Sequence, residues 1–565
     1  MSQLTKLKTA KTIYDVAALL DYKASAIAYI LYKKAAVEKY RSFSIPKKGG
    51  GERWIDMPSD DLKQLQRRLS DLLQNCQEEI RNATGRIDNV SHGFTRNRSI
   101  ISNARAHRGR KHVFNVDLCD FFGTINFGRV RGYFIADRDL QLDPKVATIL
   151  AQIACFDNRL PQGSPCSPVI SNLIGHILDV HLVRLSQQQG VRYSRYADDL
   201  TFSTNRTTFP EAIAERLPPV GWRVGPELAR LLAVSGFSIN PLKTRMQYRT
   251  SRQEVTGLVV NQKVNVSRDY RRTVRGMVHR LFSTGAFEVD GKAGTISQLH
   301  GMLGFVDGID VYNRQLHKSL EGMKYLSAKE SIYRDFLLYK EFFASPVPVI
   351  ICEGKTDNIY LKLAINALDK AFPQLASVAP DGKVTRKVRI YRYSDTSTGR
   401  ILGITGGTPH LAKLIKTYAL ETKRFLPPVA QQPFIFLVDN DSGSTSKGGI
   451  FPAVLNATNG AVKIDRSKPY THVTANLFVA PTPLLPVEVD SQMEDFFDAA
   501  TKAVVLNGKT FDPKNEYDTA TSYGKHIFAQ KVILANGAKV DFTGFSTILQ
   551  SLCHIIDLYH PGIKI

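Results

Sequence analysis

The spacing of apolar residues predicts several helices and a hairpin in the first third of the chain. Residues 10–40 and, more regularly, residues 60–82 repeat apolar side chains at the three- and four-residue spacing of an amphipathic helix. Between these regions, two short extended runs flank the stretch KKGGG, which predicts a hairpin with basic residues at its tip. A further long helix is expected over residues 167–185, where apolar residues again recur on one side.

Two extended segments in the middle of the chain end in acidic residues. The run VFNVD predicts a strand that ends at Asp117. The run YSRYADDLTFST, residues 193–204, predicts a hairpin whose turn carries Asp198 and Asp199. Two adjacent like charges in this turn have no basic residue in their flanks nearer than Arg195, so their counter-charge has to come from elsewhere.

The pattern changes at residue 346. The continuous apolar runs VPVIIC and PFIFLV predict buried strands, and the first is followed by an amphipathic helix. Buried strands that alternate with helices indicate a parallel α/β sheet. Before this region, residues 318–346 are charged and predict a connecting helix, whereas residues 442–470 are rich in Ser, Gly and Asn and predict an exposed loop.

Length and composition favour a multidomain protein of a reducing compartment. A chain of 565 residues is too long for one ordinary core and predicts two to four domains. The sequence contains no apolar run long enough to cross a membrane, and its N-terminus lacks the apolar region of a signal peptide. Its six cysteines contain no CxxC pair, which argues against zinc and against a disulfide framework. We therefore expect a soluble protein of the cytoplasm.

The net charge of +23 is distributed unevenly along the chain. Residues 1–330 contain 49 Lys and Arg against 31 Asp and Glu, whereas residues 331–565 contain 26 against 21. A basic excess of this size is typical of proteins that bind a polyanion, although a generally basic, solvated surface is the alternative. A membrane surface fits less well, because no basic amphipathic helix stands apart from the core pattern. The first part of the chain is therefore the predicted nucleic-acid-binding part.

The acidic residues of the middle segments suit metal-dependent phosphoryl transfer. Two metal ions about 3.5 to 4 Å apart can hold the attacking and leaving oxygens, and they need several carboxylates at one place. Asp198 and Asp199 supply two of them, and Asp117 at the end of a neighbouring strand is the candidate for the third. Magnesium would then be the missing counter-charge. A solvated loop is the alternative for an isolated pair of aspartates.

Five ordered motifs resemble the polymerase domain of reverse transcriptases. DLCDFF, LPQGSPCSP, YADD and SGFSINPLKT follow one another as in the palm of that family, and the basic hairpin precedes them. The resemblance implies an α+β right-hand polymerase with fingers (1–110), palm (111–258) and thumb (259–320), joined to the rest by a connecting helix (321–345). It also implies two Mg²⁺ ions held by Asp117, Asp198 and Asp199, with Lys243 as the proton donor to pyrophosphate. The implied nucleotide-binding residues are Lys47, Lys48, Arg53, Phe122, Gln162 and Gly163, with Arg53 the strongest candidate in the hairpin.

Two further motifs narrow the resemblance to retron reverse transcriptases. NARAH and VTGL are similar to the NAxxH and VTG signatures of that bacterial family. Its members use one structured noncoding RNA, start DNA synthesis from a guanosine 2′-hydroxyl and remain bound to the branched RNA–DNA product, msDNA. Selecting one RNA requires shape readout and phosphate contacts. The implied nucleic-acid-binding residues are Asn103, His107, Val255, Thr256 and Gly257, together with the thumb residues Arg268, Arg271, Arg272, Arg275 and His279.

The C-terminal part, residues 346–565, resembles a TOPRIM domain over about residues 346–460. Glu353 ends the first predicted strand, and Asp439 and Asp441 end the second, so all three are expected at one edge of the sheet. By the resemblance these three residues are catalytic and bind Mg²⁺. A Walker A loop is excluded because position 349 is Val rather than Gly, and the EGK turn argues against an RNase H domain. A second tier of candidates, as in some TOPRIM nucleases, is Glu494, Asp495 and Lys525.

The combined expectation is a bacterial, cytoplasmic retron RNA-directed DNA polymerase with a fused Mg²⁺-dependent TOPRIM nuclease that acts in anti-phage defence. Its expected partners are a cognate noncoding RNA, the msDNA product, dNTPs and the nucleic-acid substrate of the nuclease, with no membrane and with room for a homo-oligomer. Two alternatives stay open at this point. In the first, the C-terminal part is a noncatalytic oligomerisation or binding module. In the second, the polymerase is of an abortive-infection type that needs no dedicated RNA.

Overall fold

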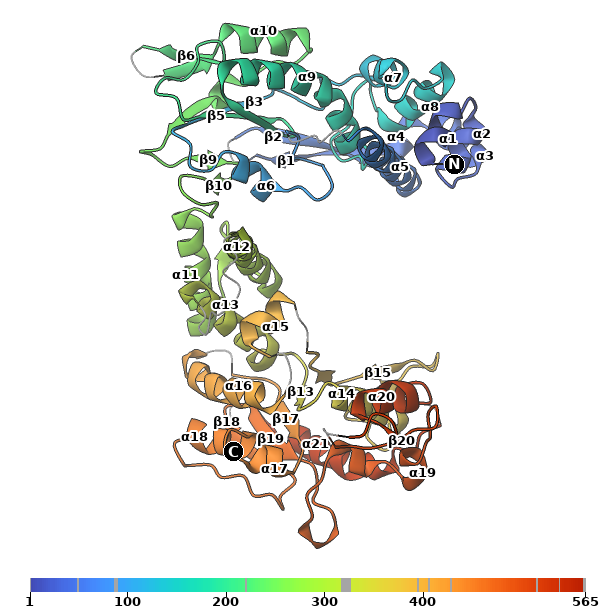
Figure 1. Cartoon of the computed structure of the whole chain (residues 1–565), viewed down its shortest axis with the longest axis vertical. Coiled ribbons are helices and arrows are strands. Elements are labelled where there is room, and N and C mark those ends of the chain that lie inside the picture. Colours follow the sequence, from blue (N-terminus) through green and yellow to red (C-terminus); the bar gives the residue numbers. More distant parts are fainter. Residues whose placement is uncertain are drawn as a thin grey trace. The chain divides into compact units, whose positions relative to one another are not determined.

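The computed structural model divides the chain into two compact units, Met1–Ser267 and Arg268–Ile565, and each is described by itself (Figure 1). The described residues are 2–47, 50–85, 90–218, 221–316, 327–393, 396–404, 407–426, 429–514, 517–537 and 539–561. None of the helices in these ranges combines the length and apolarity that crossing a lipid bilayer requires. All six cysteines are free, as their scattered positions predict.

Short helices precede one long helix in the first unit. The region 10–40, predicted as helical, is broken at Asp21, whose φ of 51° is left-handed. The long helix α5 (Asp60–Thr84) follows the predicted range, buries its regularly spaced leucines and ends at Gly85, where φ is 62°. The short helices are α1 (Gln3–Thr9), α2 (Ile13–Leu19), α3 (Ala24–Ala28), the π-helical turn η1 (Tyr29–Lys33) and α4 (Ala36–Lys39).

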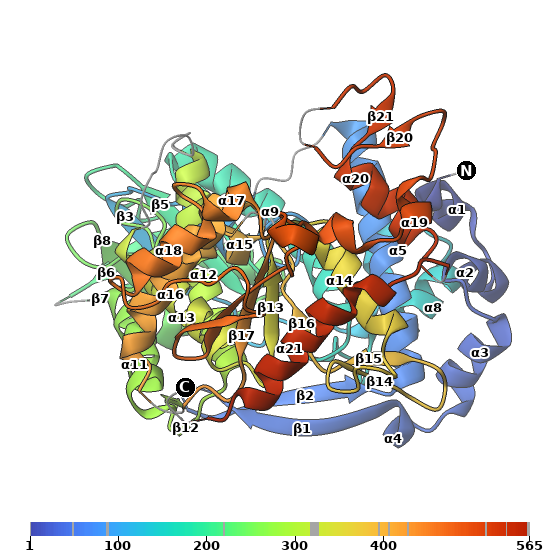
Figure 2. The same cartoon turned by 90° about the horizontal axis from the view of Figure 1, so that it is seen from below.

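The predicted basic hairpin is present as an antiparallel pair. Strand β1 (Tyr40–Pro46) pairs with β2 (Glu52–Pro58) over their full lengths, from Tyr40 opposite Pro58 to Pro46 opposite Glu52. The two strands run side by side as one ribbon in both views (Figures 1 and 2). Gly50 and Gly51 have φ of 88° and 79°, conformations in the tip that favour glycine.

A four-stranded antiparallel sheet in the order β4-β5-β3-β8 forms the centre of the first unit. Its strands are β4 (Arg192–Tyr196), β5 (Asp199–Thr204), β3 (His112–Asp117) and β8 (Arg245–Tyr248). Helix α9 (Ser167–Gln189) packs on this sheet and ends at Gly190, whose φ is 63°. The other elements are α6 (Ile100–Ala106), α7 (Phe127–Ala136), α8 (Pro144–Ala154), β6 (Ala214–Leu217), β7 (Gly221–Val224), α10 (Pro226–Val234), η2 (Pro241–Lys243), β9 (Glu254–Val255) and β10 (Leu258–Val259).

The second unit begins with helices that share a core with the region after them. Helix α11 (Arg268–Thr284) buries Val274, Leu281 and Phe282 in one hydrophobic cluster with residues from Tyr339 to Val479. Phe282 lies 4.7 Å from Phe425 and 5.4 Å from Tyr339 between ring centroids. The domain boundaries expected at 320 and 346 therefore differ from the division at 267. The elements are α11, β11 (Glu288–Val289), β12 (Lys292–Ala293), α12 (Ile296–Leu316), α13 (Ala328–Leu338) and the π-helical turn η3 (Tyr339–Phe343).

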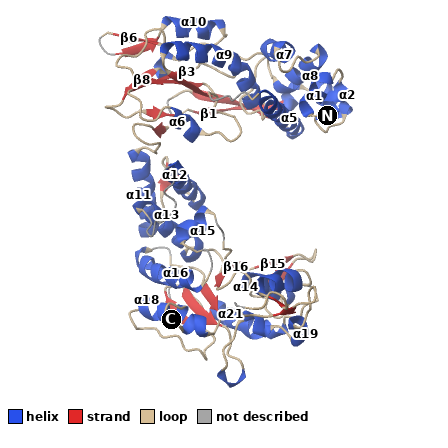
Figure 3. Cartoon of the chain, in the orientation of Figure 1, coloured by secondary structure: helices blue, strands red, loops and turns tan. Residues whose placement is uncertain are grey.

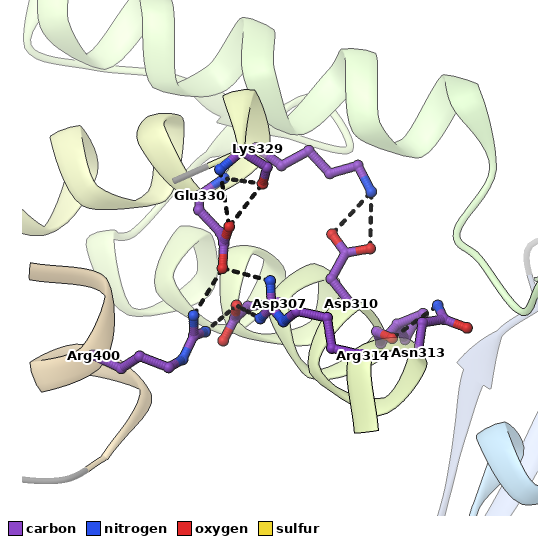
Figure 4. A network of polar contacts seen from close by, with 9 residues as sticks. Asp307, Asp310, Asn313, Arg314, Lys329, Glu330 and Arg400 are labelled. Carbon is purple, nitrogen blue, oxygen red and sulfur yellow. Dashed lines mark hydrogen bonds and ion pairs between the residues drawn. The ribbon is translucent and has the colours of Figure 1, made fainter. Parts of the chain in front are cut away.

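The predicted connecting helix is only partly within the described residues, since 317–326 lie outside them. Its described part, α13 and η3, is anchored by charged side chains (Figure 4). Glu330 binds Arg314 of α12 at 2.6 Å and Arg400 of α15 (Ser397–Leu402) at 2.7 Å. Arg400 also contacts Asp307 of α12. Burial alone would raise the pKa of Glu330, but hydrogen bonds from Ser327 and Arg400 outweigh it and lower the pKa to about 2.

A five-stranded sheet in the order β16-β13-β17-β19-β18 follows, and its first four strands are parallel. Alternate residues of these strands enter two different hydrophobic clusters, so both faces of the sheet are buried. Figure 3 shows the strands of this sheet among the helices of the second unit. This double burial explains the continuous apolar runs of the sequence. The strands are β16 (Arg389–Ile390), β13 (Val349–Cys352), β17 (Phe434–Val438), β19 (Leu477–Pro481) and β18 (Thr471–Thr474).

Helices cover the two faces of this sheet. One cluster joins it to α16 (Thr408–Glu421) and α18 (Ile450–Ala457), and the other to α14 (Asp357–Ala367) and α21 (Ser546–Leu558). The exposed loop predicted over 442–470 is therefore wrong in part. It contains α17 (Ser442–Thr445) and α18, because Ile450 and Val454 lie one helical turn apart and are buried.

The remaining elements of the second unit surround this sheet. They are β14 (Ala376–Val378), β15 (Val384–Arg386), η4 (Thr422–Arg424), η5 (Pro486–Glu488), η6 (Met493–Phe496), α19 (Ala499–Lys502), β20 (Thr510–Phe511), β21 (Ser522–Tyr523), α20 (Lys525–Ile527), the π-helical turn η7 (Phe528–Leu534) and η8 (Thr543–Phe545).

Candidate functional site

Three acidic residues of the first unit meet at one end of its central sheet. Asp117 is the last residue of β3 and stands directly opposite Asp199, the first residue of β5. Residues opposite each other in antiparallel strands have Cβ atoms about 5 Å apart. Asp198 lies in the two-residue turn after β4, and its carbonyl oxygen accepts a hydrogen bond from the Leu118 amide at 3.0 Å. Strand register alone therefore brings the three predicted acids together.

The negative charges of these residues are only partly balanced. Burial and the charge of Asp117 raise the pKa of Asp198. Burial and the charges of Asp198 and Asp117 raise the pKa of Asp199 to about 7. The Lys243 Nζ lies 2.9 and 3.0 Å from the two carboxylate oxygens of Asp117, and this hydrogen bond raises the pKa of Lys243. One ammonium group thus faces three carboxyl groups.

Three of the residues expected to contact a nucleotide lie on the β1–β2 hairpin or in the LPQG loop that packs on it. The Asp56 amide of β2 donates a hydrogen bond to the carbonyl oxygen of Gln162 at 2.8 Å, which joins the hairpin to the LPQG loop. At Gly163, where φ is 130°, a Cβ atom would lie 2.6 Å from the Asp56 carbonyl oxygen, so only glycine fits. Arg53 is exposed, and its positive charge lowers the pKa of Asp198 against the effect of burial.

Phe122 and the two lysines of the hairpin tip are the remaining residues expected to bind the nucleotide. Phe122 is half-buried, with its ring centroid 6.1 Å from that of Phe94. Lys47 is exposed, whereas Lys48 lies outside the described residues.

The NARAH motif lies beneath the hairpin that carries the acids. Asn103 and His107 are completely buried. The two ring nitrogens of His107 each lie 2.7 Å from a serine hydroxyl, Ser203 of β5 and Ser194 of β4, and the Ser194 hydroxyl also donates to the Asn103 side chain. Burial lowers the pKa of His107 to about 3, so the ring is uncharged near neutral pH. Both side chains are enclosed by protein, and the expected direct contact with nucleic acid is corrected to a contact with the hairpin.

The VTG motif forms the turn between β9 and β10 and packs against α6. Val255 is buried, whereas Thr256 and Gly257 carry left-handed backbone with φ of 47° and 78°. The motif thus supports the same helix as the NARAH residues. Among the arginines of α11, Arg268, Arg272 and Arg275 are exposed and Arg271 is half-buried, while His279 is also exposed.

In the second unit, Glu353 and Asp439 meet at the carboxyl ends of two adjacent parallel strands, β13 and β17. The Asp439 amide lies 3.3 Å from the Glu353 carboxylate, which accepts from it. The Ser444 hydroxyl donates to the same Glu353 oxygen at 3.3 Å, and the Thr408 hydroxyl at the start of α16 contacts the other. The predicted proximity of Glu353 and Asp439 is thus present in the structure.

Two more buried acids and one lysine belong to this cluster. Burial and the charges of Asp357, Glu353 and Glu494 raise the pKa of Asp439 well above its usual value. Burial also raises the pKa of Asp357 and of Glu494. The Lys525 Nζ lies 3.0 Å from the Glu494 carboxylate. Asp357 was missed as a site residue, although it is the last residue of the EGKTD motif and could have been found there.

Two of the predicted acids have local structural partners instead. One carboxylate oxygen of Asp441 accepts hydrogen bonds from the amides of Gly443 and Ser444 at 2.9 and 3.1 Å and so caps α17. The Asp495 carboxylate accepts from the Gln492 amide at 2.8 Å at the start of η6.

The chemistry of both clusters fits a magnesium ion. Carboxylate oxygens are the donors that Mg²⁺ prefers, and an excess of negative charge is what a divalent cation neutralises. Across the ranges that the structure describes, however, no three acidic, histidine or cysteine side chains are gathered as metal ligands are. In the first cluster, both oxygens of Asp117 are turned toward Lys243.

Comparison with protein families places the first cluster in context. The family model described as reverse transcriptase (RNA-dependent DNA polymerase) matches residues 45–260. This range includes strand β2 of the hairpin, the central sheet and all three acids. The fold and the site of the first unit therefore define a reverse transcriptase domain.

Several individual relatives of this chain are retron reverse transcriptases. The chain is 35% identical over 290 residues to the retron Mx65 reverse transcriptase of Myxococcus xanthus, covering 48% of this chain and 63% of that protein. It is 30% identical over 220 residues to the retron Ec73 reverse transcriptase of Escherichia coli, covering 36% and 67%. It is 29% identical over 330 residues to the retron Ec86 reverse transcriptase of the same species, covering 58% and 92%. The chain belongs to the retron-type reverse transcriptase family.

These matches cover only part of this chain and only part of each relative. With 63% coverage, the chain spans less than two thirds of the Mx65 protein. Among solved structures, a telomerase of Candida albicans in complex with a fragment of telomeric RNA is similar over 53% of this chain and 63% of its own, at 10% identity and a TM-score of 0.31.

Proposed function

We propose that the protein is an RNA-directed DNA polymerase that copies a cognate noncoding RNA into the DNA of a branched RNA–DNA molecule, msDNA. The observation that carries this proposal is the register of β3 and β5, which sets Asp117 opposite Asp199 with Asp198 in the adjoining turn. Membership of the retron-type family supports the choice of RNA template and product. The exposed arginines of α11 supply a basic surface for the nucleic acid.

Each residue around the acids has a role in this reaction. Asp117, Asp198 and Asp199 would hold Mg²⁺, which supplies the neutralising charge for the transferred phosphate and activates the primer hydroxyl. Arg53 is placed to bind phosphate oxygens of the incoming dNTP with its fork of donors. Lys243 is protonated and can donate its proton to the leaving pyrophosphate.

Two further groups line the nucleotide. The ring of Phe122 would exclude a ribose 2′-hydroxyl and so favour dNTPs, while Gln162 and Gly163 would contact the template and the incoming nucleotide. Lys48, in the tip of the hairpin, is a second candidate for contact with the triphosphate.

Removing one carboxylate tests the polymerase. We expect Asp198→Asn to abolish RNA-templated primer extension, a loss of at least about 1000-fold, because one neutral ligand weakens binding of both metal ions. The measurement is incorporation of labelled dNTPs, with Asp465→Asn as the control, since Asp465 is an exposed acid of the second unit whose carboxylate accepts hydrogen bonds from Ser467. Full activity of Asp198→Asn would contradict the proposal.

The identity of the template is tested separately. Sequencing the nucleic acid that co-purifies with the protein should yield one discrete branched RNA–DNA species. A heterogeneous mixture would instead favour a polymerase of the abortive-infection type, which needs no dedicated RNA.

For the second unit we propose a Mg²⁺-dependent nuclease of the TOPRIM type, kept inactive by the bound RNA–DNA product and released in anti-phage defence. The supporting observation is the cluster of Glu353, Asp357, Asp439 and Glu494, which holds more negative charge than Lys525 balances and in which Asp357 and Glu494 are buried. The acids would bind Mg²⁺, and Lys525 would stabilise the extra charge on the phosphate during cleavage. The capping roles of Asp441 and Asp495 favour a competing proposal, a noncatalytic oligomerisation or binding module.

A substitution in this cluster separates the two proposals. We expect Glu353→Ala to leave primer extension intact while it removes Mg²⁺-dependent cleavage of DNA or RNA and toxicity to the host cell. The measurement is incubation of the purified chain with single- and double-stranded DNA and RNA, with and without Mg²⁺. If the unaltered chain retards nucleic acid in a gel without cutting it, the binding module is the correct alternative.

A further inference from the structure

Arg195, the basic residue nearest to the paired acids in sequence, does not neutralise them. Its guanidinium lies inside the first unit and is completely buried. It forms a two-pronged ion pair with Asp179 of α9, with Nε 2.8 Å from one carboxylate oxygen and Nη2 2.7 Å from the other. The exposed fractions of the two side chains are 0% and 1%. Helix α9 admits the guanidinium at Gly175, where a Cβ atom would lie 2.9 Å from Arg195 Cζ.

The remaining nitrogen of this guanidinium reaches the turn that carries the acids. Arg195 Nη1 donates to the carbonyl oxygen of Ala197 at 3.2 Å and to the side-chain oxygen of Asn172 at 3.0 Å. The Ala197 carbonyl belongs to the peptide unit that leads into Asp198. Because a peptide unit is planar, fixing its oxygen fixes the direction in which the Asp198 backbone continues. Ala197 itself has a φ of 55°, which a non-glycine residue keeps only when its surroundings hold it.

The opposite side of the turn is closed by backbone. A Cβ atom at Gly93 would lie 2.5 Å from the Ala197 nitrogen, so the two backbone segments are in contact with no side chain between them. Asn172 joins both sides, because its amide nitrogen donates to the Gly93 carbonyl oxygen at 2.6 Å. The His92 amide also donates to the Arg195 carbonyl oxygen at 2.8 Å. The turn is thus held between a buried charge network and a glycine.

Stability alone does not account for this arrangement. Removing two charges from water is costly, and apolar residues of similar volume are often as stabilising as a buried ion pair. We propose that Arg195, oriented by Asp179, is a positioning residue that sets the peptide before Asp198 and thereby aims Asp198 and Asp199 at the nucleotide and its metal ions. This inference rests on the proposed polymerase activity.

Two variants separate positioning from folding. Arg195→Lys keeps a positive charge for Asp179 but lacks the Nη1 nitrogen that donates to the Ala197 carbonyl oxygen. The double variant Asp179→Leu with Arg195→Met replaces the pair by apolar side chains of similar size. Arg230→Lys is the matched control, because Arg230 forms an exposed ion pair with Glu227 at 2.6 Å in the same unit.

The variants are compared in four measurements: thermal unfolding, Mg²⁺ binding by calorimetry, affinity for a template–primer duplex, and primer extension at a series of Mg²⁺ concentrations. We expect both Arg195 variants to unfold cooperatively and to bind the duplex like the unaltered chain. We expect kcat to fall about 100-fold, as for a reacting group displaced by about 1 Å. We also expect weaker Mg²⁺ binding and a higher Mg²⁺ concentration for half-maximal activity, which a smaller folded fraction would not produce.

Each outcome decides one point. Folded Arg195 variants with normal kcat and a normal Mg²⁺ requirement would overturn the positioning role while leaving the polymerase in place. Unfolding of both variants would also overturn it, because the ion pair would then serve the fold itself. An unaltered chain that extends no primer would instead refute the proposed polymerase.

Discussion

Two basic side chains close to the palm acids have different partners and therefore different consequences. Lys243 pairs directly with Asp117, whereas Arg195 turns inward to Asp179. Lys243 neutralises part of the negative charge of the three acids. Arg195 leaves that charge intact and holds the backbone of the turn that carries Asp198. Asp198 and Asp199 thus remain without a direct ion pair to either of these bases among the contacts that the structure describes, and their pKa values are raised.

The raised pKa of Asp199 predicts a pH-dependent magnesium requirement. A proton and a metal ion compete for the same carboxylate, so under the proposed function Asp199 would bind Mg²⁺ freely only above a pH of about 7 and would lose this ability as the pH falls below that value. We expect the Mg²⁺ concentration for half-maximal primer extension to rise several-fold from pH 8 to pH 6. The measurement is a Mg²⁺ titration at each pH with the template–primer duplex held at saturation. A requirement that is constant over this range would contradict the prediction.

At this scale, the sequence predicts which acids lie together where they end neighbouring strands. Asp117 with Asp199, and Glu353 with Asp439, follow from strand ends alone. Asp357 does not, because an acid at the first position of a helix is also what the helix dipole favours. Only its burial beside Asp439 distinguishes the two roles, and burial depends on the packing of η6 and α20, which no local pattern encodes.

At the scale of elements, the β4–β5 hairpin is clamped from below by α6. His107, at the end of this helix, links Ser194 of β4 to Ser203 of β5 and so ties the two strands together through one neutral ring. The sequence identifies these residues as a motif but does not show whether their side chains face the protein interior or the solvent. Buried polar residues that hydrogen-bond to one another have the same sequence pattern as polar residues at the surface. A different limit applies to the helix at 450–457, which lies inside the wider segment 442–470 whose Ser, Gly and Asn content is typical of a loop.

Removing this bridge tests the clamp. His107→Leu removes the hydrogen-bond partner of the buried Ser203 hydroxyl, whereas the Ser194 hydroxyl keeps its bond to Asn103. An unsatisfied buried hydroxyl costs about 1 to 3 kcal/mol, and we expect the free energy of unfolding to fall by about that amount or more. Adding Ser203→Ala to His107→Leu removes the unsatisfied group as well, so the double variant should be closer to the unaltered protein in denaturant unfolding than the single variant. Equal stability of the single variant and the unaltered protein would refute the clamp.

At the scale of the whole molecule, the arginine-bearing helix α11 belongs to the C-terminal unit. Its apolar side chains share a core with η3 and with the residues around Phe425, so the chain divides before Arg268. Motif order along the sequence could not reveal this division, because it assigns α11 by its place after the palm. The assignment of residues 259–320 to a polymerase thumb concerns function and stays a prediction.

Truncation tests the division. A fragment of residues 268–565 retains the complete core, and we expect it to unfold cooperatively in a thermal scan monitored by circular dichroism. A fragment that begins at residue 346 loses Phe282 and Tyr339 from around Phe425, and burying each such side chain contributes about 1.5 to 3 kcal/mol. We expect this shorter fragment to aggregate or to bind a hydrophobic dye. Cooperative unfolding of both fragments at one temperature would contradict the division.

The alternation of residues along β13 and β17 gives the C-terminal sheet two independent sides. Ile351 and Phe436 face the layer that includes α11, whereas Ile350 and Leu437 face the layer of α14 and α21. An engineer could accordingly exchange the α14 and α21 layer for that of a relative without redesigning the helix that carries the arginines. Chimeras built along this plane would keep the exposed arginines of α11 unchanged while varying the α14 and α21 layer.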